Sequence, residues 1–179
     1  MTRSRSKLWL RRYAGIVLGF LGLGLLASGV VTIAAWTQQM DAPTWLVSWI
    51  IPKVTVQELI QNKLKLIIIV DVRSLAEYQT DHIAQSVLIP LTAIEDRTGI
   101  GEVERLALIT TQPDYTRPAF VLYDNGSERS VQAYEKLKVT QLKLFVLSGG
   151  LKAWRQQVPP SQDAPVLKQM VVPIPQRSA

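Results

Sequence analysis

From residue 53 onward, short apolar runs alternate with segments that have helical spacing. The run at residues 66–70 is rich in β-branched side chains, and further apolar runs follow at 87–89, 120–123 and 144–147. Uninterrupted apolar strands of this kind are typical of a parallel sheet that is covered on both faces. Because strands alternate with helices, the pattern predicts an α/β fold with a parallel sheet and helices on both of its faces.

Local signals place the helices between these strands. Thr55 with Glu58, and Ser74 with Glu77, have the spacing of capping boxes, and each pair predicts the start of a short helix. Further helices are predicted at residues 102–109, from about residue 130 onward, and at residues 151–156.

The first part of the chain has a different pattern. No charged residue occurs from Tyr13 to Met40, and residues 14–35 are almost continuously apolar. A helix needs about 20 apolar residues to cross a bilayer, so we predict a transmembrane helix over residues 13–36. A cleaved signal peptide is the alternative, but its apolar region is shorter and ends at a small-residue cleavage site.

Glycines recur within this predicted span. Gly15 and Gly19 form a G-x-x-x-G pair, which lets a second helix approach closely. Glycine is also common in membrane helices, so the pair has a second explanation that involves no partner helix.

The formal net charge of +6 is concentrated at the amino terminus. Residues 1–12 carry five of the 20 Lys and Arg residues and no acid, which leaves 15 basic against 14 acidic residues in the rest of the chain. This basic tail predicts a cytoplasmic N-terminus by the positive-inside rule, a lipid bilayer as partner, and a periplasmic or lumenal location for the domain. No basic stripe occurs on the predicted domain, so nucleic acid is not an expected partner.

Two segments flank the predicted domain, which spans residues 53–158. Residues 37–52 are interpreted as a juxtamembrane linker. Residues 159–179 contain five prolines and no helical period, which predicts an extended, flexible tail.

A polar loop follows the apolar run at 120–123 and precedes the helix expected near residue 130. In an open α/β sheet, anions bind where a strand's carboxyl end meets a helix N-terminus, because unpaired N–H groups converge there. We call this segment the candidate loop, and its residues are Asp124, Asn125, Gly126, Ser127, Glu128, Arg129 and Ser130. The chain contains no cysteine, which excludes disulfides, thiolate metal sites and cysteine nucleophiles.

The order of these motifs resembles that of the rhodanese-like domain family. Residues 70–91, VDVRSLAEYQTDHIAQSVLIPL, resemble its first signature, and residues 147–154, LSGGLKAW, resemble its closing signature. The candidate loop has the length of the family's catalytic loop, and Arg129 and Ser130 match its last two residues. The resemblance implies a rhodanese-like, parallel five-stranded sheet, preceded here by one transmembrane helix. It also implies structural roles for Asp71, Arg73, His82, Gly149, Gly150 and Trp154.

Two positions depart from the family pattern. Gln85-Ser86 replaces the usual Gly-Ala, and Asp124 occupies the place of the catalytic cysteine. Active members carry sulfur as a persulfide on that cysteine, and a carboxylate cannot form a persulfide. We therefore expect no catalytic residue, no cofactor and no metal, and we interpret the chain as a catalytically inactive, membrane-anchored domain that binds or tethers another protein. The alternative is a sulfurtransferase-type or phosphate-handling enzyme that uses the same loop.

A different class of enzyme is suggested by residues 66–73. The segment LIIIVDVR resembles the first motif of haloacid-dehalogenase-like phosphohydrolases, in which an aspartate nucleophile follows an apolar strand. That chemistry requires a second carboxylate two residues on, and Arg73 occupies this place. The sequence therefore does not favour this reaction.

The position of Asp124 leads to an electrostatic expectation. Its carboxylate is expected to lie among the N–H groups of residues 126–130, where hydrogen bonds and the helix dipole would depress its pKa. It would then act as an internal anion in place of a substrate. Arg129 is expected to neutralise Asp124 across the loop.

Overall fold

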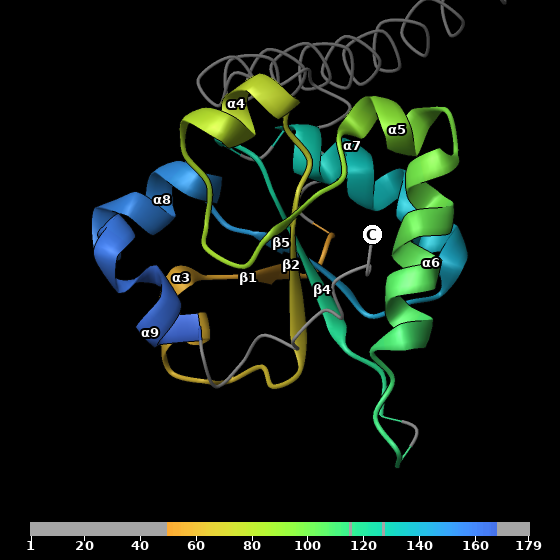
Figure 1. Ribbon diagram of the computed structural model, residues 1–179, viewed down its shortest axis with the longest axis horizontal. Helices are drawn as coiled ribbons and strands as arrows, with labels where there is room; N and C mark the ends of the chain where they lie inside the picture. Colours follow the sequence, from red (N-terminus) through yellow and green to blue (C-terminus); the bar gives the residue numbers. More distant parts are fainter. Residues whose placement is uncertain (1–49, 115, 127, 168–179) are drawn as a thin grey trace, which may run out of the picture. The chain divides into compact units, whose positions relative to one another are not determined.

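The computed structural model describes residues 50–114, 116–126 and 128–167. These residues form one parallel sheet with helices on both faces, as the sequence predicts (Figure 1). The strand order is β1-β5-β4-β2-β3, and each neighbouring pair is parallel. The strands are β1 (Lys53–Val54), β2 (Ile67–Asp71), β3 (Val87–Leu88), β4 (Ala119–Tyr123) and β5 (Leu144–Leu147).

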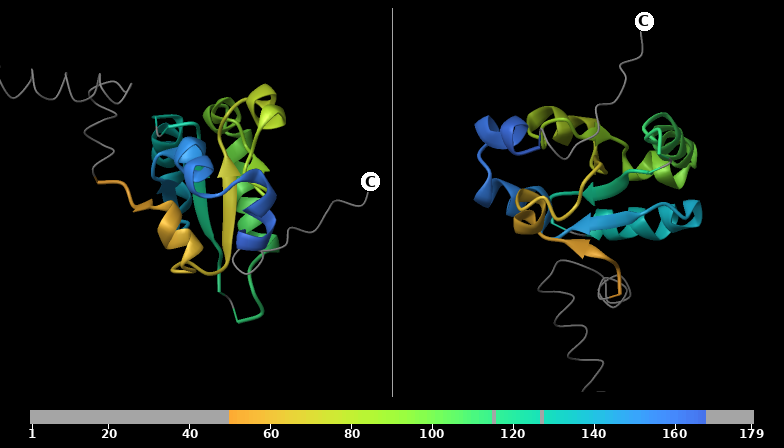
Figure 2. Two further views of the ribbon diagram at one scale, coloured as in Figure 1. Left: turned by 90° about the vertical axis from the view of Figure 1, so that its left-hand side faces the viewer. Right: turned by 90° about the horizontal axis from the view of Figure 1, so that it is seen from below.

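Apart from α4, the helices divide into two groups, one on each face of the sheet. Figure 1 shows α3, α8 and α9 on one side and α5, α6 and α7 on the other, and Figure 2 shows the same division from two further directions. The helices are α3 (Val56–Ile60), α4 (Leu75–Thr80), α5 (Leu91–Glu95), α6 (Thr98–Ile109), α7 (Glu128–Leu137), α8 (Gly150–Gln157) and α9 (Asp163–Leu167), with 3-10 turns η1 (Lys138–Thr140) and η2 (Pro160–Gln162).

The side-chain alternation of the central strands explains the two hydrophobic cores. Ile67 and Ile69 of β2 contribute to the core under α3 and α8, whereas Ile68 and Val70 contribute to the core under α6 and α7. All four side chains are essentially inaccessible to solvent. A strand that is apolar at consecutive positions therefore holds both layers of helices.

Two helices begin where local signals predict. The side chains of Thr55 and Ser74 each accept a hydrogen bond from the N–H of the glutamate three residues on, and each glutamate carboxylate accepts one from the cap residue's N–H. Both capping boxes are therefore confirmed. α4 differs from α3 because none of its residues is buried.

Neither β1 nor α5 was predicted. β1 has only two residues, too few to show a periodic pattern of apolar side chains. It pairs with β5, and the Val146 N–H donates to the carbonyl of the preceding Pro52 at 3.0 Å. α5 follows directly after Pro90, and α6 begins at Thr98 rather than at residue 102. Gly99 and Gly101 give the first turns of α6 a low helix propensity. The sequence therefore carries no clear signal for the start of this helix.

Residues just outside the predicted domain bounds, at both ends, pack against the domain. Ile51, placed in the linker by the sequence, is only 5% exposed. Residues 160–167, assigned to a flexible tail, instead form η2 and α9, and Asp163 and Leu167 are buried. The extended conformation expected for these residues is therefore wrong, because contacts from α8 hold the segment against the domain: the Trp154 Nε1–H donates to Asp163 Oδ1 at 2.8 Å.

In the part of the chain that the structure describes, no helix has the length and apolarity needed to span a membrane. The predicted span at residues 13–36 and the basic tail at 1–12 lie outside the described residues, as do residues 37–49 of the predicted linker and 168–179 of the predicted tail.

Candidate functional site

The candidate loop joins the end of β4 to the start of α7. β4 lies between β5 and β2, so the loop is flanked by α8, which follows β5, and by α4, which follows β2. These carboxyl ends lie at the top of Figure 1. The topology therefore brings three segments that are distant in sequence to one edge of the sheet, where ligands bind in open α/β folds.

Asp124 points into the loop rather than into solvent. Its side chain is 3% exposed. Oδ1 accepts the Gly126 N–H at 3.0 Å and lies 3.5 Å from the Ser130 hydroxyl, and Oδ2 accepts the Arg129 N–H at 2.8 Å. We call these N–H donors the cradle. The carboxylate thus occupies the cradle, in the place that the sequence predicts for an internal anion.

The expected pKa shift of Asp124 is wrong in sign. Burial raises the pKa of the Asp124 carboxyl above its usual value, and the hydrogen bonds from Arg129 and Gly126 lower it by less. Removal of the carboxylate from water disfavours its charged form more than two or three N–H donors favour it. Only the tertiary structure reveals this, because the sequence does not report how completely the loop is covered.

The guanidinium of Arg129 acts on Asp124 through its charge, which lowers the pKa of Asp124, but its hydrogen bonds go to another residue. Its two terminal nitrogens donate to Glu77 of α4 at 2.8 and 2.6 Å. This bidentate pair lowers the pKa of Glu77 to about 2. Glu77 also accepts the Asn125 side-chain N–H at 3.3 Å, so it holds the candidate loop from the side of α4. The sequence pointed to Glu77 only as a capping residue.

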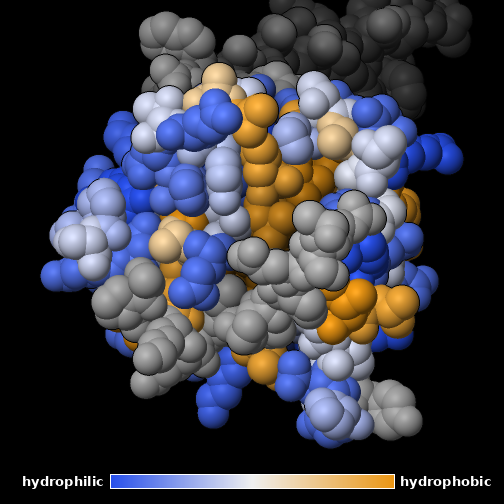
Figure 3. Space-filling view, in the orientation of Figure 1, coloured by the Kyte–Doolittle hydropathy of each residue, from blue (hydrophilic) through white to orange (hydrophobic). Residues whose placement is uncertain are grey.

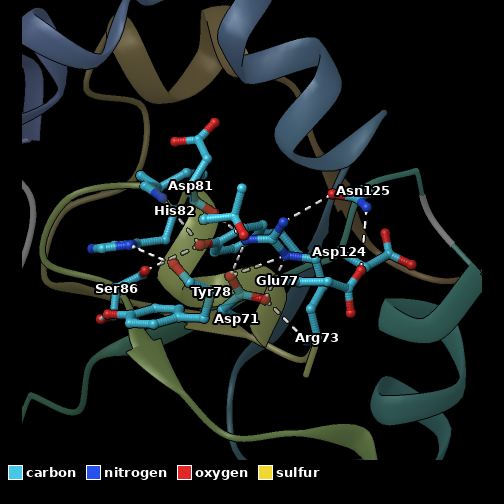
Figure 4. Close-up of polar contacts among 12 residues, drawn as sticks. Asp71, Arg73, Glu77, Tyr78, Asp81, His82, Ser86, Asp124 and Asn125 are labelled. Atoms are coloured by element: carbon cyan, nitrogen blue, oxygen red, sulfur yellow. Dashed lines mark hydrogen bonds and ion pairs between the residues drawn. The ribbon is translucent and has the colours of Figure 1, made fainter. Parts of the chain in front are cut away.

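Asp71 and Arg73 form a buried ion pair beneath the loop (Figure 4). Arg73 donates through Nε and Nη2 to the Asp71 carboxylate, with the shortest distance 2.6 Å. Its Nη1 reaches 2.9 Å from Asn125 Oδ1, and its Nη2 also donates to the Asp81 carbonyl. The guanidinium carbon lies 5.7 Å from the centre of the Tyr123 ring. Arg73 directly precedes the start of α4, and its side chain bonds to Asp81 at the end of that helix. It therefore connects the candidate loop to both ends of α4, although it lies 52 residues from Asn125 in sequence.

The two glycines of the closing signature allow α8 to approach the loop. Gly149 and Gly150 have φ angles of +72° and +55°, a region that favours glycine. A Cβ on Gly150 would lie 2.2 Å from the Asp124 carbonyl oxygen. The next N–H, that of Leu151, donates to this oxygen at 2.7 Å. The first N–H groups of a helix have no partner within the helix. One of those of α8 thus donates to the residue that begins the candidate loop.

His82 and Trp154 do not contact Asp124 through any hydrogen bond. His82 Nδ1 lies 2.9 Å from the Tyr78 carbonyl, and its ring stacks on that of Tyr78 at 4.0 Å (Figure 4). Trp154 is fully buried and bonds to Asp163 as described above. Asp163 and Asp81 are joined by Arg155, which donates to both carboxylates at 2.7 Å. The sequence did not indicate this Arg155 bridge, because its partners lie in segments brought together only by folding.

The cradle's N–H groups are arranged to bind an anion, and the carboxylate of Asp124 already accepts their hydrogen bonds. Within the described residues, no cluster of three His, Asp or Glu side chains could hold a metal ion. Ser127 lies outside the described residues, and Glu128 begins α7.

Residues 54–157 match the family described as Rhodanese-like domain, which is more than half of the chain. No curated protein matches the chain significantly.

Several solved structures are similar to this chain at low sequence identity. A rhodanese-related protein from Thermoplasma volcanium is 22% identical over 59% of this chain and 92% of its own, with a TM-score of 0.46. A Saccharomyces cerevisiae homologue of single-domain rhodanese and the Cdc25 phosphatase catalytic domain is 20% identical over 60% of this chain and 81% of its own, with a TM-score of 0.50. A rhodanese-like domain protein from Staphylococcus aureus is 25% identical over 58% of this chain and 91% of its own, with a TM-score of 0.44. Together with the family match, the parallel five-stranded sheet and its central candidate loop establish that this chain belongs to the rhodanese-like domain family.

Proposed function

We propose that this chain is a membrane-anchored, catalytically inactive rhodanese-like protein whose domain binds or tethers another protein. One observation carries the proposal: the Asp124 carboxylate accepts the cradle's N–H groups at 3.0 and 2.8 Å, in the place where the family resemblance puts a cysteine thiolate. A thiolate is nucleophilic and forms a persulfide, whereas a carboxylate forms none. The whole sequence contains no cysteine that could take over this role.

The surroundings of Asp124 support a binding role over turnover. An incoming anionic substrate would meet the carboxylate already bonded to the cradle, and two like charges at one site repel each other. The Glu77–Arg129 pair and Asn125 further tie the loop to α4. The fold is thus retained while its reactive centre is replaced by a structural one, which leaves the surface as the functional part of the domain.

A sulfur-transfer assay tests the catalytic part of the proposal. The purified full chain is expected to transfer no sulfur from thiosulfate to cyanide above the level of a boiled sample. Asp124→Ala serves as a matched variant, since it removes the carboxylate and leaves the other loop side chains in place. Turnover by the natural sequence that Asp124→Ala abolishes would show an unusual enzyme and contradict the proposal.

We also propose that residues 13–36 anchor the chain, with residues 1–12 in the cytoplasm and the domain in the periplasm or a lumen. The uncharged, apolar stretch and the five basic residues before it support this topology. Protease added to intact spheroplasts, or to right-side-out vesicles, is expected to digest the domain. A domain that is protected until the membrane is broken has the opposite orientation.

The tethering role requires a protein partner, whose identity is open. A photo-crosslinking side chain placed at Asn125, which is exposed at the mouth of the loop, is expected to capture one defined protein in native membranes. The same side chain at the exposed Lys63, at the far end of β2, provides the control. Equal or absent capture at both positions would argue against a partner at the candidate loop.

A further inference from the structure

The segment after α8 returns to the domain and is held there by a buried carboxylate. Residues 160–167 form η2 and α9, and we call them the strap. Asp163 of the strap is 2% exposed, and its Oδ1 accepts the Trp154 Nε1–H at 2.8 Å and the Arg155 Nη1–H at 2.7 Å. Its Oδ2 accepts the Ala84 N–H at 3.1 Å. Asp163 therefore fixes the strap to α8 and to the segment that links α4 to β3.

The strap also has an apolar anchor. Leu167 is inaccessible to solvent and packs in the core that contains Leu59 and Trp154, and Val166 packs against the same core. The outer surface over α8 is mainly hydrophilic (Figure 3), and the apolar side chains of the strap are directed inward. The strap is therefore docked by a polar contact at Asp163 and by an apolar contact at Leu167.

Arg155 extends the contact from the strap to α4. Its guanidinium donates to the Asp81 carboxylate at 2.7 Å and to the His82 carbonyl at 2.6 Å. Asp81 is the C-cap of α4, and its carbonyl accepts an N–H of Arg73 Nη2 at 2.6 Å. Arg73 in turn donates to Asn125 of the candidate loop at 2.9 Å (Figure 4). Hydrogen-bonded groups therefore connect the strap to the candidate loop without a break.

α4 is the element that this connection can release most easily. None of its residues is buried, and its attachment to the domain includes the Glu77–Arg129 pair and a hydrogen bond from the Tyr78 hydroxyl to the Ser86 carbonyl at 2.7 Å. An element with few buried apolar contacts opens at a low free-energy cost. Loss of the Arg155 contacts at the end of α4 should therefore loosen α4 and the candidate loop before it affects the sheet.

The strap is an addition to the domain that matches the family, because that match ends at residue 157. We propose that the strap is a regulatory device of this chain. When it is docked, Asp163 holds Arg155, Arg155 holds the end of α4, and the candidate loop is kept in an ordered form. When the strap is released, α4 and the candidate loop loosen together. Because such coupling is reciprocal, a ligand of the ordered loop also favours the docked strap. The consequence for a protein partner rests on the proposed function, whereas the coupling between strap and loop does not.

Hydrogen exchange of the full chain in detergent tests the coupling. Leu167→Ala removes the apolar anchor and changes no side chain of the connection between Asp163 and Asn125. Exchange in α4 and in residues 124–130 is expected to become faster by about fivefold or more, because their local opening no longer requires release of a docked strap. Val166→Ala, at a partly buried position, is the milder variant and is expected to act in the same direction even if Leu167→Ala does not fold.

Leu106→Ala separates this coupling from a general loss of stability. Leu106 is as deeply buried as Leu167 but belongs to the core on the opposite face of the sheet, so its truncation destabilises the domain by a similar mechanism. Exchange in the candidate loop is expected to stay within about twofold of the natural protein, since the loop exchanges through local opening. If the strap variants leave the loop unchanged, or if Leu106→Ala accelerates its exchange equally, the strap only adds stability and the proposal is wrong.

Arg155→Gln tests the assigned route. It removes the guanidinium that joins Asp163 to Asp81, so it is expected to accelerate exchange in α4 and the candidate loop as Leu167→Ala does. Adding Leu167→Ala to Arg155→Gln is then expected to accelerate this exchange by less than about twofold further, because the connection is already broken. Fully additive effects would contradict the proposal.

Photo-crosslinking at Asn125 reports on the partner separately. An ordered loop binds at a lower entropic cost, so Leu167→Ala is expected to reduce capture in native membranes by about fivefold. If exchange changes as expected and no protein is captured by the natural chain, the tethering role is wrong and the coupling of strap and loop stands.

Discussion

Asp124 and Arg129 are bonded through the backbone of the arginine and not through its side chain. The Arg129 N–H donates to Asp124 Oδ2 at 2.8 Å, while the guanidinium is directed to the carboxylate of Glu77. The charge of Asp124 is therefore stabilised mainly by backbone N–H groups, with a smaller contribution from the charge of Arg129, and its burial is only partly offset. The expected consequences of this arrangement can be measured.

The pH dependence of stability is expected to reveal the buried carboxyl. Because the pKa of Asp124 is raised in the folded protein, the folded state binds its proton more tightly than the unfolded state, whose aspartate pKa is near 3.9. Its contribution to stability is then greatest below pH 3.9 and is lost as pH rises through the folded pKa. The free energy of unfolding of the natural protein minus that of Asp124→Asn is expected to increase as pH falls from 7 to 4.5, as measured by urea denaturation.

Asp114 provides the control for this experiment. It is exposed, and the hydrogen bond from the Thr116 N–H lowers its pKa. The corresponding difference for Asp114→Asn should therefore not increase as pH falls. The same trend for both variants would show that burial of Asp124 is not the cause.

Removal of the Asp124 carboxylate should free the cradle for an external anion. In Asp124→Ala the N–H groups of Gly126 and Arg129 lose their acceptor, and sulfate can accept them. Sulfate at ten times its Kd would stabilise the variant by about 1.4 kcal/mol. Since sulfate stabilises proteins in general, the expected result is a larger rise in Tm for Asp124→Ala than for the natural protein, with chloride at equal ionic strength as reference. Equal rises would show that the cradle is not an anion site.

Gly150→Ala is expected to destabilise the domain by about 3 kcal/mol or more. The added methyl would lie 2.2 Å from the Asp124 carbonyl oxygen, and the residue has a φ of +55°, so both the packing and the backbone oppose the change. Gly101→Ala in α6 is the matched control, because a Cβ there meets no atom within 4 Å. It is expected to be neutral or to stabilise by up to about 1 kcal/mol. Chemical denaturation of both variants tests the comparison.

Glu77→Gln is expected to loosen the candidate loop more than it destabilises the domain. The side chains of Glu77 and Arg129 are 32% and 36% exposed, so solvent screening limits the effect on stability to about 1 kcal/mol or less. Hydrogen exchange of the amides at Gly126 and Arg129 should nevertheless become faster, because the loop loses its attachment to α4. The contribution of Glu77 is present above its unfolded pKa, near 4.3, and is lost as pH falls towards 2.

The matched change for Glu77→Gln is Glu135→Gln, which breaks a partly exposed ion pair with Lys138 at the C-terminal end of α7, the end away from the candidate loop. It should leave exchange in the loop unchanged. If both variants, or neither, alter exchange in the loop, Glu77 does not hold it.

Asp163→Ala is expected to cost about 2 to 4 kcal/mol, because it leaves the buried Trp154 N–H without an acceptor and removes one of the two carboxylates to which Arg155 donates. Trp154→Phe removes only the N–H donor and should cost less, about 1 kcal/mol. Thermal or urea unfolding distinguishes the two. A neutral Asp163→Ala would mean that α9 contributes nothing to the stability of the domain.

The sequence alone was sufficient for the features that depend on neighbouring residues. The apolar run at 66–70 indicated a covered parallel strand, and the spacing of Thr55 with Glu58 marked a helix start, because strand burial and capping leave local patterns. The motifs around the candidate loop indicated the family, and the absence of cysteine limited its chemistry. Elements too short to show a period, such as β1, left no such signal.

Only the tertiary structure decided which residues meet and how deeply they are buried. Arg129 pairs with Glu77, 52 positions earlier, and Arg155 joins Asp81 to Asp163, contacts that no local pattern encodes. The sign of the Asp124 pKa shift reversed for the same reason: hydrogen bonds within a loop can be anticipated from its sequence, but exclusion of water depends on every segment that packs over it, and here burial outweighs the bonds.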